Sequence, residues 1–331
     1  MSWYQASRSI AAAALVAATA LLSACGGGGS GSGSAASSAA SNQLKLSTAV
    51  QSEPVARYAA AFGILSGPGV AAIYTSVVQS LVSSVSASTA TATTVCPASG
   101  SIVVATQNAG TSGLQGGETA TVNFNQCVGQ VSAPGVSSSA TVSGSVTVQV
   151  QSAQGVVGDD TANWSYTAVE SANNLTLVSS NGTTVLNGTA TFTMSYDAAT
   201  GVTTTTASSP SVTLNITHAA TSGNVSGTIS ITSLSYSRVH DSDPSGDTVS
   251  TSGGISVQAS DAVIAFNVTT PTPVTISNGV VQGGVIQLSG DNAVESITPG
   301  GNSTVNISVT ANGQTGTYSE TLDSLRQLTG S

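Results

Sequence analysis

The sequence predicts an all-β fold, in which a large antiparallel sheet is curved or partly closed into a barrel. Three patterns predict it. Apolar and polar residues alternate through most of the chain after Val95, as they do in strands with one buried and one solvated face. Asn-Gly pairs stand at three expected turns, and an apolar segment with helical spacing precedes the strands. Tandem β-sandwich domains are the alternative, although no second linker divides the body.

The first 24 residues have the features of a secretory signal peptide. Arg8 is the only basic residue there, and the apolar run from Ile10 to Leu22 is shorter than the roughly 20 residues that span a bilayer. Small residues, Ser23 and Ala24, then lead directly to Cys25. We therefore expect cleavage close to Cys25.

The motif Leu22-Ser23-Ala24-Cys25 resembles the lipobox of bacterial lipoprotein precursors. The resemblance implies that residues 1–24 are removed and that Cys25 receives a diacylglycerol on its sulfur and an acyl chain on its new amino group. Several acyl chains give stable attachment to a membrane without a spanning segment. The resemblance also implies sorting to the outer membrane, because Gly26 replaces the Asp that retains such proteins at the inner membrane.

Residues 25–44 are predicted to be a flexible tether, since the stretch from Gly26 to Ser41 is almost wholly Gly, Ser and Ala. Residues 45–331 are predicted to be a single β-rich domain that begins with a helical segment at about 52–87. One or two helices packed on the sheet are expected there, and Gly67-Pro68-Gly69 favours a break between two short ones. The second carries an apolar stripe at helical spacing, formed by Val70, Ile73, Tyr74, Val77, Val78, Leu81, Val82 and Val85.

The strands are identified by apolar residues at alternate positions. The clearest sets are Val146, Val148 and Val150; Ala190, Phe192, Met194 and Tyr196; and Val212, Leu214 and Ile216. Asn312-Gly313 is the most convincing hairpin turn, because both residue types tolerate positive φ. Gly144, Gly188, Gly227 and the Gly283-Gly284 pair recur inside these runs, and we expect them to mark bulges or sharp bends that curve the sheet.

The charge balance excludes a nucleic-acid partner. After removal of residues 1–24, the basic side chains are Lys45, Arg57, Arg238 and Arg326, against fourteen carboxylates. Nucleic-acid binding needs clustered Lys and Arg, and this chain has no such cluster.

Two cysteines, Cys96 and Cys127, remain in the body once Cys25 is lipidated. An extracytoplasmic compartment permits disulfides, so we predict that they pair. The bond would stabilise the fold by about 3.6 kcal/mol in the chain-entropy model. A metal or redox pair is the alternative, but the close C-x-x-C spacing is absent.

The densest acidic cluster follows His240 and contains Asp241, Asp243 and Asp247. Carboxylates at alternate positions with a glycine at the turn are typical of an oxygen-ligand calcium loop, which makes these residues a candidate calcium site. Pro244 and the lack of a Glu at the twelfth position favour a solvated hairpin tip instead. We expect no other cofactor.

Catalytic motifs are scarce in this chain. It has two histidines, His218 and His240, and neither an H-E-x-x-H nor a G-x-S-x-G sequence. We therefore expect a non-enzymatic lipoprotein of the outer membrane, with a structural role or a protein partner in the envelope. A carrier of a lipid or other apolar ligand is the second hypothesis and an enzyme the third. The segment from Thr121 to Cys127, with the Gly144 strand, resembles β-rich envelope lipoproteins without a known activity.

Overall fold

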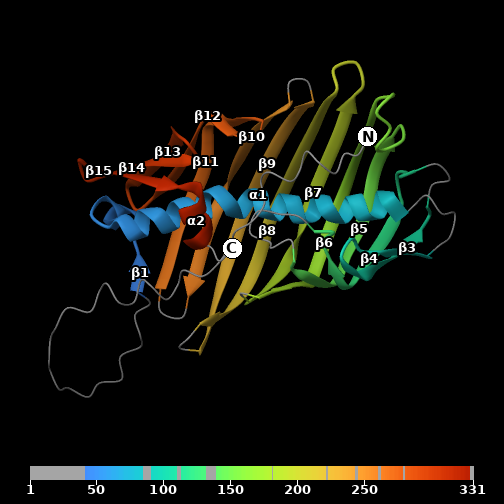
Figure 1. Ribbon diagram of the computed structural model, residues 1–331, viewed down its shortest axis with the longest axis horizontal. Helices are drawn as coiled ribbons and strands as arrows, with labels where there is room; N and C mark the ends of the chain where they lie inside the picture. Colours follow the sequence, from blue (N-terminus) through green and yellow to red (C-terminus); the bar gives the residue numbers. More distant parts are fainter. Residues whose placement is uncertain are drawn as a thin grey trace.

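One sheet of fifteen strands, which does not close into a barrel, forms the body of this computed structural model (Figure 1). The structure describes residues 42–84, 91–109, 113–131, 139–180, 182–220, 223–242, 245–259, 262–278 and 280–328. The predicted signal peptide, Cys25 and residues 26–41 lie outside these ranges. In chain order the elements are β1 (Asn42–Leu44), η1 (Leu46–Val50), α1 (Glu53–Ser84), β2 (Thr91–Val95), β3 (Ser99–Gln107), β4 (Thr119–Val128), β5 (Thr141–Gln154), β6 (Trp164–Ser179), β7 (Gly182–Asp197), β8 (Val202–Ala220), β9 (Gly223–Ser242), β10 (Ser245–Ala259), β11 (Ala262–Ser277), β12 (Val280–Gly290), β13 (Ala293–Gly301), β14 (Thr304–Ala311), β15 (Gln314–Thr321) and α2 (Leu322–Leu328).

Strands β2 to β15 follow one another across the sheet in sequence order, each antiparallel to its neighbours. This meander confirms the predicted curved antiparallel sheet, and the tandem sandwich is excluded because one sheet contains every described strand. Strand β1 departs from the pattern, since it pairs in parallel with β11 from Ala262 to Ile264. Residues 42–44 were predicted to be part of the tether. They form a strand instead, because they pair with the part of β11 that extends beyond the register of β12.

The helical segment is one continuous helix packed on the sheet, within the predicted one or two helices, but the predicted break at Gly67-Pro68-Gly69 was wrong. Helix α1 passes through Gly67-Pro68-Gly69 without a break. A proline inside a helix costs about 3 kcal/mol. Apolar residues on both sides of Pro68, such as Phe62 and Val70, are buried, and each contributes about 1.5–3 kcal/mol. Burial of the whole segment therefore outweighs the cost of the proline.

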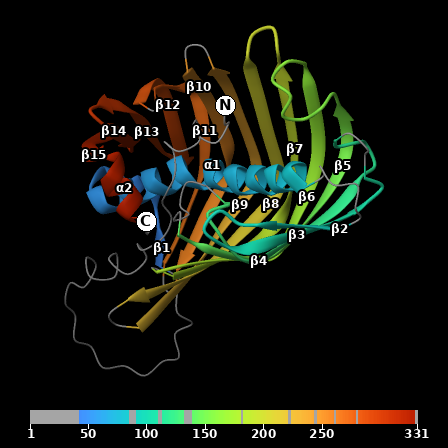
Figure 2. The ribbon, with the colours of Figure 1, turned by 45° about the vertical axis from the view of Figure 1, so that its right-hand side comes forward.

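The curved sheet surrounds α1 on its concave side, and the helix crosses the strands from the β15 edge toward the β2 edge (Figure 2). Most residues of α1 are buried, and the less buried ones recur at helical spacing along one side of the helix: Arg57, Ile64, Leu65, Pro68, Ala72, Thr75, Gln79 and Val82. The helix is long and apolar enough to cross a membrane by length and composition alone. Its buried residues pack instead in the core that the sheet encloses; they include Val55, Ala56, Tyr58, Ala59, Ala60, Ala61, Phe62, Val70, Ala71, Ile73, Tyr74, Val77, Val78 and Leu81.

Small residues let α1 approach the sheet closely. A Cβ atom on Gly63 would lie 2.5 Å from Leu288 Cδ2, and one on Gly67 would lie 2.6 Å from Thr251 Oγ1. A larger residue at either position would have to displace one of these side chains, so both glycines favour close packing of the helix on strands β10 and β12. Farther along the helix, Tyr74 donates a 2.8 Å hydrogen bond to the carbonyl oxygen of Gly188 in β7.

The predicted inward-facing residues are confirmed by their burial. Val146, Val148 and Val150 of β5 are at most 1% exposed, and the inward residues of β8, Val212, Leu214 and Ile216, are buried as well. The outward residues are mainly Thr and Ser, which hydrogen-bond across strands in the pairs Thr167 with Thr193, Ser171 with Thr189 and Thr310 with Thr315. The sheet therefore has an apolar concave face and a hydroxyl-rich convex face.

The structure confirms some of the predicted turn and bulge positions but not all of them. Asn312 and Gly313 join β14 to β15 with φ values of 51° and 74°, which confirms the predicted hairpin. Gly144 has a φ of 112° and is skipped in the register between β5 and β6, so it is a bulge. Gly227, in contrast, pairs with Ile216 and Ala259 without a register shift, so it does not mark a bulge.

Cys96 and Cys127 form the predicted disulfide. Cys96 follows β2 and Cys127 lies on β4, and both are almost fully buried. The bond therefore links the end of the edge strand to the second strand inward from it.

An ion pair connects the start of α1 to the other edge of the sheet. Arg57 Nε lies 2.8 Å from Glu320 Oε1 on β15, and Arg57 Nη2 donates a 2.6 Å hydrogen bond to Ser324 Oγ on α2. Glu320 is 9% exposed. Tyr318 adds a nearby connection, since its hydroxyl donates to the carbonyl oxygens of Ala49 and Val50.

Replacing Arg57 by Met should destabilise the protein by about 2 kcal/mol, because Glu320 would remain buried without its cation. The double variant Arg57→Met, Glu320→Leu should recover most of that loss, since neither charge is then left alone. Unfolding in urea measures the free energy of unfolding of the single and the double variant. Equal destabilisation by the single and double variants would contradict the assignment of the loss to an unpaired carboxylate.

Candidate functional site

Three ionisable side chains meet on the concave face, where β9 and β10 pair. Arg238 and His240 are two residues apart on β9, so both face the same side of the sheet. Asp247 of β10 is the register partner of His240. Leu234 and Tyr236 precede them on this face, and Leu234 lies next to α1 at Gly67. The cluster therefore continues the side of the sheet that α1 covers.

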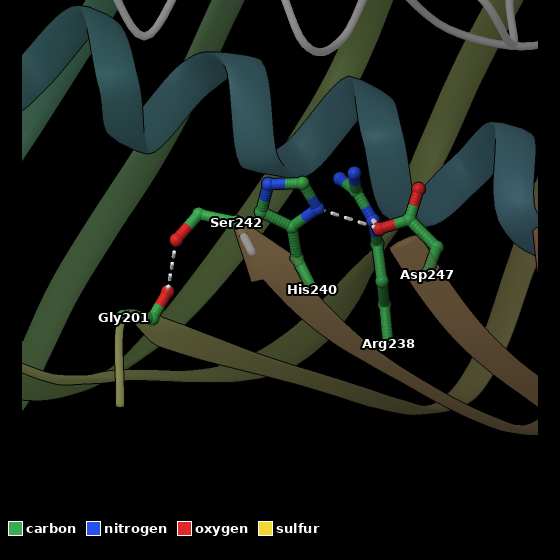
Figure 3. A network of polar contacts seen from close by, with 5 residues as sticks. All are labelled: Gly201, Arg238, His240, Ser242 and Asp247. Carbon is green, nitrogen blue, oxygen red and sulfur yellow. Dashed lines mark hydrogen bonds and ion pairs between the residues drawn. The ribbon is translucent and has the colours of Figure 1, made fainter. Parts of the chain in front are cut away.

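One carboxylate oxygen of Asp247 contacts the side chains of both Arg238 and His240. Arg238 Nε donates to Asp247 Oδ1 at 2.8 Å, and His240 Nδ1 lies 2.9 Å from the same atom. Figure 3 shows both side chains directed at this carboxylate. The side chains of Arg238, His240 and Asp247 are 31%, 18% and 11% exposed, so solvent reaches the guanidinium more easily than the carboxylate.

The pKa of Asp247 is lower than that of an ordinary aspartate. Partial burial opposes ionisation, but the hydrogen bonds from His240 and Arg238 and their positive charges outweigh it. Tyr236 lies beside the same groups, and burial raises its pKa to about 12, with Arg238 lowering it and Asp247 raising it. Asp247 is therefore ionised at neutral pH and Tyr236 is a neutral hydroxyl.

Strand β8 adds hydroxyl groups to this region. Thr203 is the register partner of His240, and Thr205 is the partner of Arg238. Thr203 is 4% exposed, and among the described residues its Oγ1 atom has no hydrogen-bond partner. A buried hydroxyl without a partner is uncommon and costs free energy. At the rim, Ser242 Oγ donates a 3.2 Å hydrogen bond to the carbonyl oxygen of Gly201 (Figure 3).

The pairing of β9 with β10 does not bring the carboxylates of Asp241 and Asp247, two of the candidate calcium ligands, to the same face of the sheet. Asp241 adjoins His240 on β9, so its side chain points to the opposite face from Asp247. Asp247 is engaged by Arg238 and His240, and Asp243 lies outside the described residues. Within the part of the chain that the structure describes, no group of three or more His, Cys, Asp or Glu side chains could hold a metal ion.

The sequence interpretation did not identify two buried glutamates in which both carboxyl oxygens lack a hydrogen-bond partner among the described residues. Glu170 of β6 and Glu295 of β13 are 0% exposed, and none of their carboxyl oxygens has a hydrogen-bond partner among the described residues. Burial raises the pKa of Glu295 to about 9 and that of Glu170 well above its usual value. Glu295 is therefore neutral at pH 7, and burial disfavours the ionised form of Glu170 as well.

A signal for these carboxyl groups exists in the sequence. Glu170 occupies an inward position of β6 between Ala168 and Ala172, and Glu295 lies between Ala293 and Ile297 on β13. The period-two pattern that identifies the strands thus places both glutamates on the apolar face. Their environment is aromatic or aliphatic: Tyr166 lies on the same face as Glu170.

The other residues considered as candidates, two aromatic residues, an aspartate and a histidine, lie outside the cluster around Asp247. Trp164 and Tyr166 are buried and share the inward face of β6, and Trp164 stacks on Tyr196 with ring centroids 5.9 Å apart. Asp159 is exposed and accepts hydrogen bonds from Thr161 within its turn. The backbone of His218 belongs to β8, but its side chain lies outside the described residues.

Comparisons with protein-family models, with curated proteins and with solved structures found no match to this chain.

Proposed function

We propose that the protein is a lipid-anchored protein of the bacterial outer membrane, with a structural or binding role in the cell envelope and no catalytic activity. The lipobox from Leu22 to Cys25 carries the proposal. The Gly, Ser and Ala-rich segment that follows it would connect the lipid to a body whose described part begins at Asn42.

Two features of the body support this placement. The Cys96–Cys127 disulfide agrees with an oxidising compartment, where such bonds form and persist. The convex face has cross-strand hydroxyl pairs such as Thr167 with Thr193, and so it is polar with few charges. A protein held close to a membrane surface by its lipid could present this face to an envelope partner.

The structural or binding role is favoured over a carrier of apolar ligands. A carried lipid would need the concave apolar face of the sheet. Helix α1 packs against that face over most of its length, with Tyr74, Val77 and Leu81 fully buried against it. A ligand would have to displace the helix to reach the same surface.

The anchor is tested by expressing the full chain in a Gram-negative host with labelled palmitate and separating the two membranes on a density gradient. We expect labelled protein in the outer-membrane fraction. Cys25→Ser should abolish the label, and Gly26→Asp should keep the label but move the protein to the inner membrane. Unlabelled, soluble wild-type protein would contradict the proposal.

A further inference from the structure

Three hydrogen-bonding groups on the concave face are left without partners by the contacts around Asp247. Asp247 Oδ1 engages Nε of Arg238 and Nδ1 of His240. Within the described ranges, no hydrogen bond or ion pair involves the two Nη atoms of Arg238 or Nε2 of His240. The Oγ1 atom of Thr203, although buried, likewise has no partner there.

These groups occupy adjacent positions on two strands. Thr203 and His240 are directly opposite each other on β8 and β9, a relation that places Cβ atoms about 4.5–5.5 Å apart. Arg238 is the next residue along the same face of β9. The guanidinium, imidazole and hydroxyl therefore border one area of the concave face, near the ends of their strands.

Asp247 holds the two cationic groups in place. Because it binds Arg238 through Nε, the paired Nη atoms remain available as a planar fork, which matches the two oxygens of a carboxylate or phosphate. Because it binds His240 through Nδ1, the opposite ring atom Nε2 is left to face a ligand, and that atom donates a proton when the ring is charged. At 31% exposure the guanidinium can be reached from solvent.

We propose that Thr203, Arg238 and His240 form a binding site for an oxyanion, the shared chemistry of carboxylates, free phosphate and lipid phosphate groups. The ligand would receive hydrogen bonds from the Arg238 fork, from Nε2 of His240 and from the Thr203 hydroxyl. It would thereby satisfy the buried hydroxyl of Thr203. The site does not depend on the lipid anchor, so the proposed site and the proposed location of the protein are tested independently.

The test uses the full chain, purified in a non-ionic detergent with labelled histidine, and follows the imidazole signals by NMR at pH 6.0. The sequence contains only His218 and His240, so a His218→Gln variant assigns both signals. Inorganic phosphate, acetate and a short-chain phosphatidylglycerol are titrated in turn. We expect a saturable shift of the His240 signal with at least one of them, and the tightest binder distinguishes a free phosphate, a carboxylate or a lipid headgroup.

Three variants test the residues. Arg238→Gln should weaken binding at least about tenfold, as expected for loss of a charged fork. Thr203→Val should weaken it by about three- to tenfold, as for one neutral hydrogen bond, while leaving the contacts of Asp247 intact. Lys45→Gln removes the exposed cation of Lys45, far from the site in sequence, and should leave affinity unchanged.

Two results would overturn the site. One is the lack of a saturable shift with any of the three probes up to about 50 mM. The other is equal affinity of the wild type and both site variants, which would mean that the anion binds elsewhere. Thr203→Val keeps the comparison valid even if Arg238→Gln fails to fold, because valine has nearly the shape of threonine.

Discussion

At pH 7, Glu295→Gln should unfold about 5 °C above the wild type, whereas the two proteins should unfold at the same temperature at pH 4. Burial raises the pKa of Glu295 from 4.5 to about 9. As pH rises above 4.5, the unfolded chain loses this proton first, so the folded state loses stability up to about pH 9. The loss is about 3 kcal/mol at pH 7, and Gln, which cannot ionise, avoids it.

Thermal unfolding followed by circular dichroism across pH 4–9 measures this effect. Asp291→Asn is the matched control, because Asp291 is an exposed carboxylate in the turn just before Glu295. The control should keep the pH profile of the wild type. A wild-type profile retained by Glu295→Gln would show that the carboxyl group is solvated or paired in the folded protein. Glu170→Gln should change the profile in the same direction, since burial also raises the pKa of Glu170.

Removing the disulfide should cost about 3.6 kcal/mol, the loop-closure entropy of a loop this long. The sequence separation of Cys96 and Cys127 is 31 residues. For a folded body of this size, that loss lowers Tm by about 6 °C. The paired variant Cys96→Ala, Cys127→Ala is unfolded in urea beside the wild type, with and without dithiothreitol.

The reductant serves as the internal control for this second experiment. It should bring the wild type close to the stability of the paired variant and leave the variant itself unchanged. Equal stability of the oxidised wild type and the variant would contradict a stabilising role for the bond. A variant that also responds to the reductant would indicate an effect unrelated to Cys96 and Cys127.

Local pattern was sufficient to predict the sheet but not the course of the helix. Alternation correctly placed Val146, Val148 and Val150 inside, and the Asn312-Gly313 pair correctly located a hairpin. Pro68 was taken as a helix break because its local cost is known. The compensating burial comes from strands far away in sequence, such as Leu288 against Gly63, which no local pattern reveals.

The candidate site was only partly visible in the sequence for a related reason. The spacing of His240 and Asp247 indicated a calcium loop or a hairpin tip, and neither interpretation specified which side chains share a face of the paired strands. In a strand, Asp241 and His240 must face opposite sides, which separates Asp241 from Asp247. Thr203 could not be predicted, because its place beside His240 depends on the register between β8 and β9.

The mass of the mature N-terminal peptide tests the proposed anchor most directly. Lys45 is the first basic residue after Cys25, so trypsin should release residues 25–45 as one peptide from protein isolated from membranes. We predict a peptide that begins at Cys25 and carries the mass of a diacylglyceryl group and one acyl chain. A peptide that begins elsewhere, or that contains an unmodified Cys25, would contradict the proposal that this protein is a lipid-anchored component of the envelope.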